Sequence, residues 1–511
     1  MNTYDLLIVG CGPVGATLAN YMRMKGYSVA IFDRDTEIFK APRAMQIDAE
    51  SCRIFQQIGV QSRLEGKDAR PANRHIFVGE NREPLMELDF SLLQSEDGYP
   101  AAGMRFHQPA LERLLREDFN KTTPVDTFFG YEVTEVEGDD SVATLNAEHL
   151  ETGEVTQFRG NYIVGCDGGA SLCKKYIGGQ RKDYNYSRRW IVMDVIVHDN
   201  DVWNALIDRS EFRCRADAAV VFVKGCNNHV RFDFEVTDDV ADSFNETDAR
   251  ALIAEYFNPS SIEFQRIAPY HFYAGMPDKW RRGRVFIAGD AAHLTSPFSG
   301  QGLNMGIRDA ANLAFKFDLV FRNLASDKLL DSYEEERWKN CEHVIKGATS
   351  RGLMISKSTF LGTLQRNFSF WLGSKMPKLA LEMTRKMSDF VPYENGLIGG
   401  HILSGQQMIQ PFVTDATGEK VRLDDAIGDR FGYITDKRLD TPEAEWFANT
   451  LGGIIMVMGT DLHDWDGKLT HFLETNDVSG VLIRPDRYIY DADKSSGLSI
   501  GKLKTALEAY T

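Results

Sequence analysis

The hydrophobic pattern at the N-terminus predicts a β-strand, an α-helix and a second β-strand in succession. The apolar run YDLLIVG (4–10) is typical of a buried parallel strand. In PVGATLANYMRMKG (13–26), apolar residues recur every four positions from Val14, and the segment closes on a glycine that stops a helix. The next apolar run, YSVAIFD (27–33), ends at Asp33. This pattern predicts a βαβ unit that belongs to a parallel sheet.

Later apolar runs predict another strand–loop–helix unit and a separate antiparallel sheet. Residues 284–317 begin as a strand, pass through a loop of Gly, Ser and Pro, and continue as a long helix. Other short runs rich in Val, Ile and Phe lie between turn residues, which favours an antiparallel sheet. These runs cover residues 74–79, 189–197, 218–225 and 229–236. Beyond residue 390 or so the pattern changes to that of a short α/β domain.

A glycine motif occupies the loop between the first predicted strand and its helix. Gly10, Gly12 and Gly15 have the G-x-G-x-x-G spacing, which allows a tight turn and brings backbone close to a pyrophosphate at a helix N-terminus. Asp33 ends the second strand, where an acid accepts hydrogen bonds from an adenosine ribose. The acid favours FAD or NAD over NADP, although the adjacent Arg34 weakens this distinction. The alternative is an ordinary glycine-rich structural turn.

Composition and charge argue against several classes of partner. The 511 residues carry a formal net charge of -16, which argues against nucleic acid and against a polybasic membrane anchor. The seven cysteines are scattered and include no C-x-x-C, a pattern that fits a reducing compartment and predicts neither disulfides nor a metal site. The sequence shows no signal-peptide core and no apolar run of membrane-spanning length. We therefore expect a cytoplasmic protein of two or three domains.

Four separated motifs together resemble those of the group A flavoprotein monooxygenases, aromatic hydroxylases with a p-hydroxybenzoate hydroxylase-like fold. The motifs are APRAMQIDAE (41–50), MRFHQPALERLLRE (104–117), NYIVGCDGGASLCKK (161–175) and the strand–loop–helix of residues 284–317. The resemblance is strongest to the 3-(3-hydroxyphenyl)propionate hydroxylase and phenol hydroxylase-like subgroup. A second G-x-G-x-x-G is absent from the sequence, which disfavours flavoenzymes with a separate NAD(P)H domain.

The resemblance implies an α/β fold in three parts. A Rossmann-like FAD-binding domain would carry an inserted antiparallel-sheet substrate domain, followed by a C-terminal thioredoxin-like domain. The implied boundaries are 1–73, 104–180 and 276–390 for the FAD-binding domain, 74–103 and 181–275 for the substrate domain, and 391–511 for the thioredoxin-like domain. No cysteine follows Cys341, so the last domain is expected to serve packing or a homodimer contact instead of redox exchange.

The resemblance also assigns residues to the flavin. Asp290, in the Gly289–Asp290 pair, would hold the ribityl chain, and the following helix would begin with its positive end toward the flavin pyrimidine. The other implied FAD contacts are Arg43, Gln108, Asp167, Pro297, Gly300, Gly302, Leu303 and Asn304.

The implied activity is hydroxylation of a phenolic ring through a C4a-hydroperoxyflavin, with O2 as oxidant and NADPH or NADH as co-substrate. This chemistry needs a dry site and a base within reach of the phenol. Asp48 is the implied base, with a helix N-cap as the alternative. Tyr270 would bind the phenol oxygen or else pack in the core, and Trp190 and Pro297 would line the substrate pocket. Arg231 would contact a substrate carboxylate, or else reach solvent from its strand.

Two other functions fit the same residues. One is a flavoenzyme of the same fold that modifies a polyketide, an antibiotic or another hydrophobic substrate. The other is a non-catalytic flavin-binding scaffold whose C-terminal domain mediates assembly. Product mass separates the first from hydroxylation of a small phenol, and phenol-dependent NAD(P)H consumption excludes the second.

Overall fold

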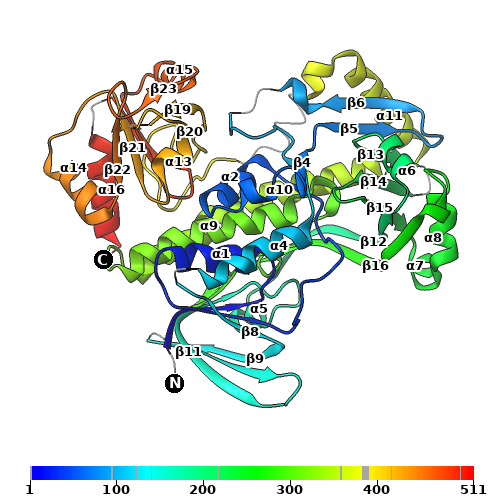
Figure 1. The fold of residues 1–511 in the computed structure, drawn as a ribbon, viewed down its shortest axis with the longest axis horizontal. Helices are drawn as coiled ribbons and strands as arrows, with labels where there is room; N and C mark the ends of the chain where they lie inside the picture. The colour runs from blue at the N-terminus through cyan, green and yellow to red at the C-terminus, as the bar shows by residue number, and fades with distance from the viewer. Residues whose placement is uncertain are drawn as a thin grey trace.

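The predicted N-terminal βαβ unit forms the centre of a large sheet (Figure 1). Strand β1 (Thr3–Val9) leads through the glycine turn into helix α1 (Pro13–Met24), and β2 (Val29–Asp33) returns parallel to β1. Leu7 of β1 lies opposite Ala30 of β2, and both are fully buried. Both faces of these strands are covered, as is usual for a parallel sheet.

Strands from two later parts of the chain complete this first sheet. The computed structural model describes residues 3–93, 96–121, 123–139, 141–215, 218–356, 359–381, 391–415, 417–494 and 497–510. Within these residues the first sheet has eight strands, with a core in the order β18-β11-β1-β2-β8 that runs parallel and with β17, β9 and β10 added antiparallel. The added strands are β8 (Asp126–Phe129), β9 (Tyr131–Gly138), β10 (Ala143–His149), β11 (Val155–Gly165), β17 (Arg281–Arg282) and β18 (Val285–Ile287).

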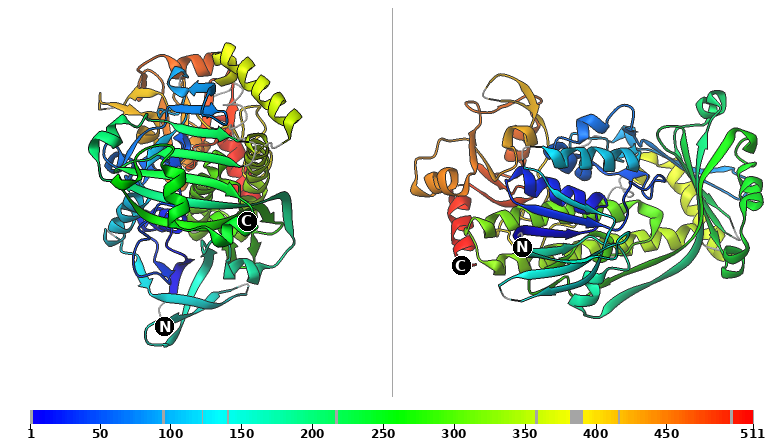
Figure 2. Two further views of the ribbon diagram at one scale, coloured as in Figure 1. Left: turned by 90° about the vertical axis from the view of Figure 1, so that its right-hand side faces the viewer. Right: turned by 60° about the horizontal axis from the view of Figure 1, so that its bottom comes forward.

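The predicted antiparallel sheet forms a second layer beside the first domain (Figures 1 and 2). In the described residues it has seven strands in the order β16-β12-β15-β14-β13-β5-β6, antiparallel except where β13 meets β5. The strands are β5 (Arg74–Val78), β6 (Pro84–Asp89), β12 (Arg181–Val197), β13 (Ser210–Cys214), β14 (Ala219–Lys224), β15 (His229–Val236) and β16 (Ile262–Pro277). Its outer face packs apolar side chains against α7 (Asp238–Ser243) and α8 (Glu246–Ile253). The inner face is free to form one wall of a site.

Glycines allow the helices of the first domain to approach closely. Helix α9 (Gln301–Phe321) crosses α1 where a Cβ on Gly306 would lie 2.5 Å from Val14 Cγ2 and 3.0 Å from the Cα of Gly289. Gly289 also has a φ of 63°, which side-chain-bearing residues rarely adopt. The turn after β18 is thereby pressed against both helices.

The chain ends in a smaller unit that lies on the opposite side of the first domain from the second sheet (Figure 1). Its four-stranded sheet has the order β22-β21-β24-β25, in which β21 and β22 are parallel and the other neighbours are antiparallel. The strands are β21 (Gly432–Thr435), β22 (Ile454–Val457), β24 (Gly480–Ile483) and β25 (Ile489–Asp493), and helix α16 (Leu498–Ala509) follows them. The expected α/β character is confirmed, while the thioredoxin-like assignment stays a prediction. The predicted boundary at 390/391 touches residues 382–390, which lie outside the described residues.

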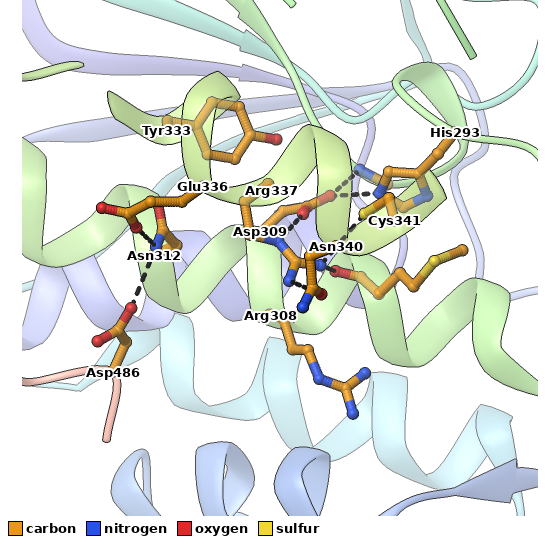
Figure 3. Close-up of polar contacts among 12 residues, drawn as sticks. His293, Arg308, Asp309, Asn312, Tyr333, Glu336, Arg337, Asn340, Cys341 and Asp486 are labelled. Atoms are coloured by element: carbon orange, nitrogen blue, oxygen red, sulfur yellow. Dashed lines mark hydrogen bonds and ion pairs between the residues drawn. The ribbon is translucent and has the colours of Figure 1, made fainter. Parts of the chain in front are cut away.

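A buried ionic cluster joins this C-terminal unit to the first domain, and Figure 3 shows its two acids, Glu336 and Asp486, on either side of Asn312. Arg484, just after β24, donates to both carboxylate oxygens of Glu336 on α10 (Ser332–Ile355), at 3.0 and 2.8 Å. Asp486 and Lys316 complete the cluster, and all four side chains are 2% exposed or less. Burial alone would raise the pKa of Glu336, but Arg484 and Lys316 outweigh burial and hold that pKa at about 2.

None of the described helices combines the length with the apolar character that crossing a bilayer requires.

Removal of the Glu336 charge is expected to weaken the joint between the two units. Glu336→Gln leaves buried cations without their partner and should lower the free energy of unfolding by about 3–5 kcal/mol. The exposed neighbour Glu335 provides the control, and Glu335→Gln should change the free energy of unfolding by less than about 0.5 kcal/mol. Urea unfolding followed by tryptophan fluorescence measures both values.

The same pair gives a direction for the pH dependence. The pKa of Glu336 is about 2, below its ordinary 4.5, so its stabilisation is complete above pH 4.5 and is lost as the pH falls toward 2. The stability difference between wild type and Glu336→Gln should therefore shrink below pH 4.5. A difference that stays constant down to pH 3 would contradict the ionic role.

Candidate functional site

A cavity of about 1560 Å³ lies between the glycine-rich loops of the first sheet and the inner face of the second. Its first end is formed by loops that follow β1, β11 and β18, and its second end by side chains of the antiparallel sheet. All the residues predicted from the sequence to bind cofactor or substrate line this cavity, with two exceptions. The exceptions are Gly15 and Asn304.

The glycines after β1 form a backbone cradle. Gly10 has a φ of 98°, and a Cβ there would lie 2.4 Å from the carbonyl oxygen of Cys166. Gly15 lies beneath it, because a Cβ on Gly15 would lie 2.1 Å from the Gly10 carbonyl oxygen. At Gly12 a Cβ would meet no atom within 4 Å, so this glycine keeps space open above the cradle. No side chain of the described residues caps α1 at Gly12, which leaves its first N–H groups available to an anion.

Asp33 lies at the rim of the cradle. Its carboxylate accepts the N–H of Cys11 at 2.7 Å and that of Asp35 at 2.9 Å, which fixes it at the carboxyl end of β2. Arg34 is exposed and lines the same part of the cavity. The structure thus brings the predicted acid to the glycine loop. Its contact with a ribose stays a prediction.

Gln108 fixes the segment that carries Arg43. Gln108 begins helix α4 (Gln108–Glu117), and its Oε1 accepts the N–H groups of Arg43 and Ala44 at 2.9 and 2.7 Å. The Gln108 amide nitrogen in turn donates to Glu112 at 2.8 Å. The backbone of residues 43 and 44 is therefore held along one side of the cavity, which the exposed Arg43 also lines.

Asp167 presents an acceptor without a partner. One carboxylate oxygen accepts the N–H of Leu172, at the start of α5 (Leu172–Ile177), at 2.8 Å. The other, Oδ1, is buried and has no hydrogen bond within the described residues. Burial raises the pKa of Asp167. A hydroxyl or amide of a bound group would satisfy this oxygen.

The loop after β18 brings backbone to the far side of the cavity. Asp290 and the N-terminus of α9 converge there, since a Cβ on Gly302 would lie 3.9 Å from Asp290 Oδ1. Gly300, the N-cap residue of α9, has a φ of 60°, and Pro297 and Leu303 line the cavity beside it.

The side chain of Asn304 does not reach the cavity. Its Oδ1 accepts the backbone N–H of Asp48 at 3.1 Å and the hydroxyl of Ser51 at 2.8 Å, and its Nδ2 donates to the Gly300 carbonyl at 2.8 Å. Asn304 therefore ties α9 to α2 (Ala49–Gln57) and closes its own first turn. Any flavin contact of Asn304 stays a prediction.

A buried acid supports this loop from behind (Figure 3). Asp309 of α9 accepts the N–H of Gly289 at 3.0 Å, meets His293 Nε2 at 2.6 Å and accepts from Arg337 at 2.8 Å. Burial alone would lower the pKa of His293, but Cys341 and Asp309 outweigh it and raise that pKa to about 10. His293 does not line the cavity. We therefore regard it as a positioning residue for the loop.

The inner face of the second sheet is largely aromatic and aliphatic. Alternate residues of its strands point into the cavity, which is lined by Phe77, Trp190, Val192, Phe212, Val221 and Val223. Trp190 is fully buried, and its ring meets that of Phe298, next to Pro297, edge-on at 5.3 Å. Trp190 pairs with Tyr270 across β12 and β16. The predicted substrate residues Trp190, Tyr270 and Pro297 thus meet at one wall.

One corner of this face is charged. Asp194 accepts from Arg266 at 2.8 Å, lies 3.4 Å from Arg231 Nε and contacts His229 at 2.9 Å. Arg231 donates to the carbonyl of Arg43 at 2.7 Å, and Arg266 to that of Pro42 at 2.9 Å. The sheet therefore holds the loop of residues 42–43 by its backbone. A substrate contact of Arg231 stays a prediction.

The two predicted catalytic side chains have defined partners. Asp48 Oδ1 accepts the N–H of Ser51 at 2.9 Å, so the N-cap of α2 is confirmed, and its Oδ2 accepts from Arg308 at 2.5 Å. The Tyr270 hydroxyl accepts from Arg266 at 2.8 Å. Both side chains line the cavity, and neither contact blocks a role toward substrate.

Several charged residues of the cavity were missed by the sequence analysis, and three of them bear on the chemistry of the site. They are Arg105, Asp233 and Arg308. Arg105 lies three residues before Gln108, within a motif that was read only for its glutamine. Asp233 stands in HVRFDFEV (229–236), where strict alternation marks a polar face that is ordinarily solvated. Burial raises the pKa of Asp233 to about 6.

The cavity fits a flavin dinucleotide on its own geometry. The Gly10 cradle and the uncapped start of α1 suit a pyrophosphate, Asp33 suits a ribose, and the buried Asp167 oxygen needs a donor. These features define a dinucleotide-binding α/β protein with a second, aromatic-lined chamber. The FAD binding domain family matches residues 3–348, and the chain belongs to that family. The HcaD C-terminal domain family matches residues 405–506.

Relatives of known name match along nearly the whole chain. The probable NADH-specific resorcinol 4-hydroxylase of Rhodococcus jostii is 27% identical over 97% of this chain and 94% of its own length. The 3-(3-hydroxy-phenyl)propionate/3-hydroxycinnamic acid hydroxylase 1 of Burkholderia vietnamiensis is 28% identical over 95% of this chain and 89% of its own.

Solved structures share the fold. The flavin-dependent monooxygenase PieE, in complex with FAD and substrate, superposes with a TM-score of 0.82 at 18% identity and covers 100% of both chains. Aklavinone-11 hydroxylase, in a ternary complex with FAD and aklavinone, gives 0.81 at 19% identity and covers 99% of both chains.

Two alanine substitutions should separate the structural from the cofactor-facing glycine of the cradle. Gly10→Ala should destabilise the protein even without cofactor, because its φ and the Cys166 carbonyl both exclude a Cβ. Gly12→Ala meets no protein atom and should leave the unfolding temperature of the apoprotein unchanged. It should still weaken FAD binding at least about tenfold, since a methyl group there blocks close backbone approach.

Fluorescence titration of apoprotein with FAD, together with thermal unfolding of the apo variants, measures both effects. Normal FAD affinity in Gly12→Ala would show that the cofactor does not approach this backbone.

Proposed function

We propose that this protein is an FAD-dependent monooxygenase that hydroxylates a phenolic aromatic substrate. In the overall reaction, the phenol, O2, NAD(P)H and a proton give the hydroxylated phenol, NAD(P)+ and water. One oxygen atom enters the ring and the other leaves as water. The observation that carries the proposal is a single cavity in which the dinucleotide cradle opens directly onto an aromatic-lined sheet. The relatives support the proposal, since they are named as hydroxylases of resorcinol and of 3-(3-hydroxy-phenyl)propionate.

The FAD would be held by the elements that surround the first end of the cavity. The cradle at Gly10 and Gly12 would take the pyrophosphate, Asp33 the ribose, and Asp167 and Asp290 the polar groups between it and the flavin ring. Bound FAD would supply the redox chemistry, which is the transfer of two electrons from NAD(P)H to O2. The sheet above excludes water from the substrate with its apolar side chains.

Asp48 is proposed as the proton acceptor for the phenol. Loss of the phenol proton raises the nucleophilicity of the ring carbons ortho and para to the oxygen. Arg308, which also pairs with Glu50, holds the Asp48 carboxylate at the cavity wall. Capping of α2 uses only one of the two carboxylate oxygens, so the structural and catalytic roles are compatible.

Tyr270 is proposed to orient the phenol oxygen. Its hydroxyl accepts a hydrogen bond from Arg266, which leaves its own proton free to donate to the substrate. Asp233 is an alternative base, since its raised pKa of about 6 suits proton transfer near neutral pH.

The remaining parts of the proposal concern context. We infer a cytoplasmic homodimer, with the domain boundaries given above and with NADH or NADPH as the reductant. Light scattering on the purified protein tests the oligomeric state, and limited proteolysis tests the boundaries.

Isotope labelling tests the reaction itself. The purified protein, supplied with NADH or NADPH, a phenol and 18O2, should give a product that contains one 18O atom. Two results would reject the hydroxylase assignment. In one, the product takes its new oxygen atom from water, as shown by a repeat with unlabelled O2 in H2 18O. In the other, NAD(P)H is consumed but every phenol tested yields only H2O2.

A substitution at Asp48 tests the base. Asparagine also caps helices, so Asp48→Asn should fold normally while the carboxylate is lost. Its kcat should fall by about 10²–10⁴-fold at pH 7. Activity should recover as the pH approaches about 10, where a phenol ionises without help.

Asp233→Asn is the matched variant across the cavity. If activity recovers at high pH in Asp233→Asn and not in Asp48→Asn, the base is Asp233 of the second sheet and not Asp48. The pH profile, and not the loss of rate alone, separates a base from a merely structural acid.

A further inference from the structure

Arg105 is a buried cation at the wall of the substrate chamber. It lies on β7 (Met104–Phe106), the middle strand of a small sheet with β3 (Gln46–Ile47) and β4 (Ala69–Pro71). The residue is 2% exposed and lines the cavity. Arginine is rarely buried to this extent unless a carboxylate accompanies it.

No carboxylate of the described residues accompanies Arg105. Its guanidinium donates only to neutral oxygens, those of Gln46 at 2.9 Å and Ser210 at 2.5 Å, and its Nε has no hydrogen-bond partner within the described chain. Burial, and to a smaller extent the like charge of Arg70, lowers the pKa of Arg105 to about 10. An isolated buried charge is costly, so a partner is expected from outside the chain.

Three other arginines of the cavity wall differ in this respect. Arg231 lies 3.4 Å from both Asp194 and Asp233, and Arg266 donates to Asp194 at 2.8 Å. Arg308 binds both Asp48 and Glu50. Their charges are balanced within the protein. Among these four arginines of the described cavity wall, Arg105 is the one for which the described residues supply no carboxylate partner.

The surroundings of Arg105 suit an anionic group of modest size. Ser210 of β13 lies opposite His75 of β5, and both residues line the cavity together with Arg105. Burial and the charge of Arg105 lower the pKa of His75 to about 3, so the imidazole is neutral and does not compete for an anion. Its Nε2 is buried and without a hydrogen-bond partner in the described residues. The hydroxyl of Ser210 and this ring nitrogen can complete the shell of a carboxylate.

We propose that Arg105 is the receptor for a carboxylate on the aromatic substrate, with Ser210 and His75 as its neighbours. The substrate is thus a phenol with a carboxylate side chain, and its ring lies under the aromatic face of the sheet. This inference rests on the proposed hydroxylase function and narrows its substrate class. It also assigns the carboxylate contact to Arg105, where the sequence favoured Arg231.

Paired ligands test the receptor without turnover. The probes are 3-(3-hydroxyphenyl)propionate and its primary amide, which differ in charge and little in size. Their Kd values are measured from the change in flavin absorbance of the oxidised holoenzyme without NAD(P)H. A buried charge-assisted pair corresponds to about a 10- to 100-fold preference for the acid. Arg105→Met should reduce this preference to less than about threefold.

The control variants identify the arginine. Arg70 lies on β4, directly opposite Arg105 of β7. It does not line the cavity, and it pairs with Asp208. Arg70→Met should keep the full preference for the acid, and so should Arg231→Met. Arg105→Lys should show an intermediate preference, because lysine keeps the charge but loses the fork. It also provides the measurement if Arg105→Met does not fold, as judged by thermal unfolding and flavin content.

Three results would overturn the proposal. In the first, the wild type shows no preference for the acid or binds neither probe. In the second, both Arg105→Met and Arg105→Lys keep the full preference for the acid. In the third, Arg231→Met is the only variant that loses this preference. Failure of the proposed function is recognised separately. In that case the holoenzyme binds the acid through Arg105, yet no phenol acquires oxygen from 18O2.

Discussion

Helix α9 is the element on which the rest of the structure depends, because it carries buried charged side chains whose partners come from several other parts of the molecule. Arg308 pairs with acids at the start of α2, Asp309 holds the turn after β18, and Lys316 meets Glu336 and, through it, the C-terminal unit. Each charge is costly to bury alone and acceptable only when its partner is in place. The position of α9 is therefore fixed from several sides, and its N-terminus is held in place at the cavity.

The two sides of the cavity are held in the same physical manner. On one side Asp309, with Arg337 and His293, fixes the turn at Gly289 from behind. On the other side Asp194 positions two arginines of the second sheet, which bind backbone carbonyls of residues 42–43. In both cases a buried acid fixes a loop that lines the cavity, Asp309 by accepting the Gly289 N–H directly and Asp194 through two arginines. The loops themselves need little regular structure, since the charges behind them supply the rigidity.

The sequence predicted what depends on neighbouring residues and missed what depends on distant ones. The βαβ unit, the glycine cradle and the antiparallel sheet follow from periodicity and glycine spacing within short windows. The pairing of Asp48 with Arg308 joins residues 260 positions apart, and no local pattern records it. Arg105 was overlooked for a related reason, because an arginine in a short strand is ordinarily exposed. Its significance depends on burial and on the absence of an acid among the described residues around it, and both are properties of the folded molecule.

The C-terminal unit contributes to the site although it carries no reactive cysteine. Tyr488 lines the cavity and donates to Glu50 at 2.9 Å, and Glu50 shares Arg308 with the proposed base Asp48. Arg53, three residues along α2, binds Asp424 of the same unit at 2.8 Å. Helix α2 is thus held between α9 and the C-terminal unit by charges on both sides. A domain whose sequence suggested only packing or dimerisation thereby closes one wall of the cavity, and its position bears directly on the carboxylate that would accept the phenol proton.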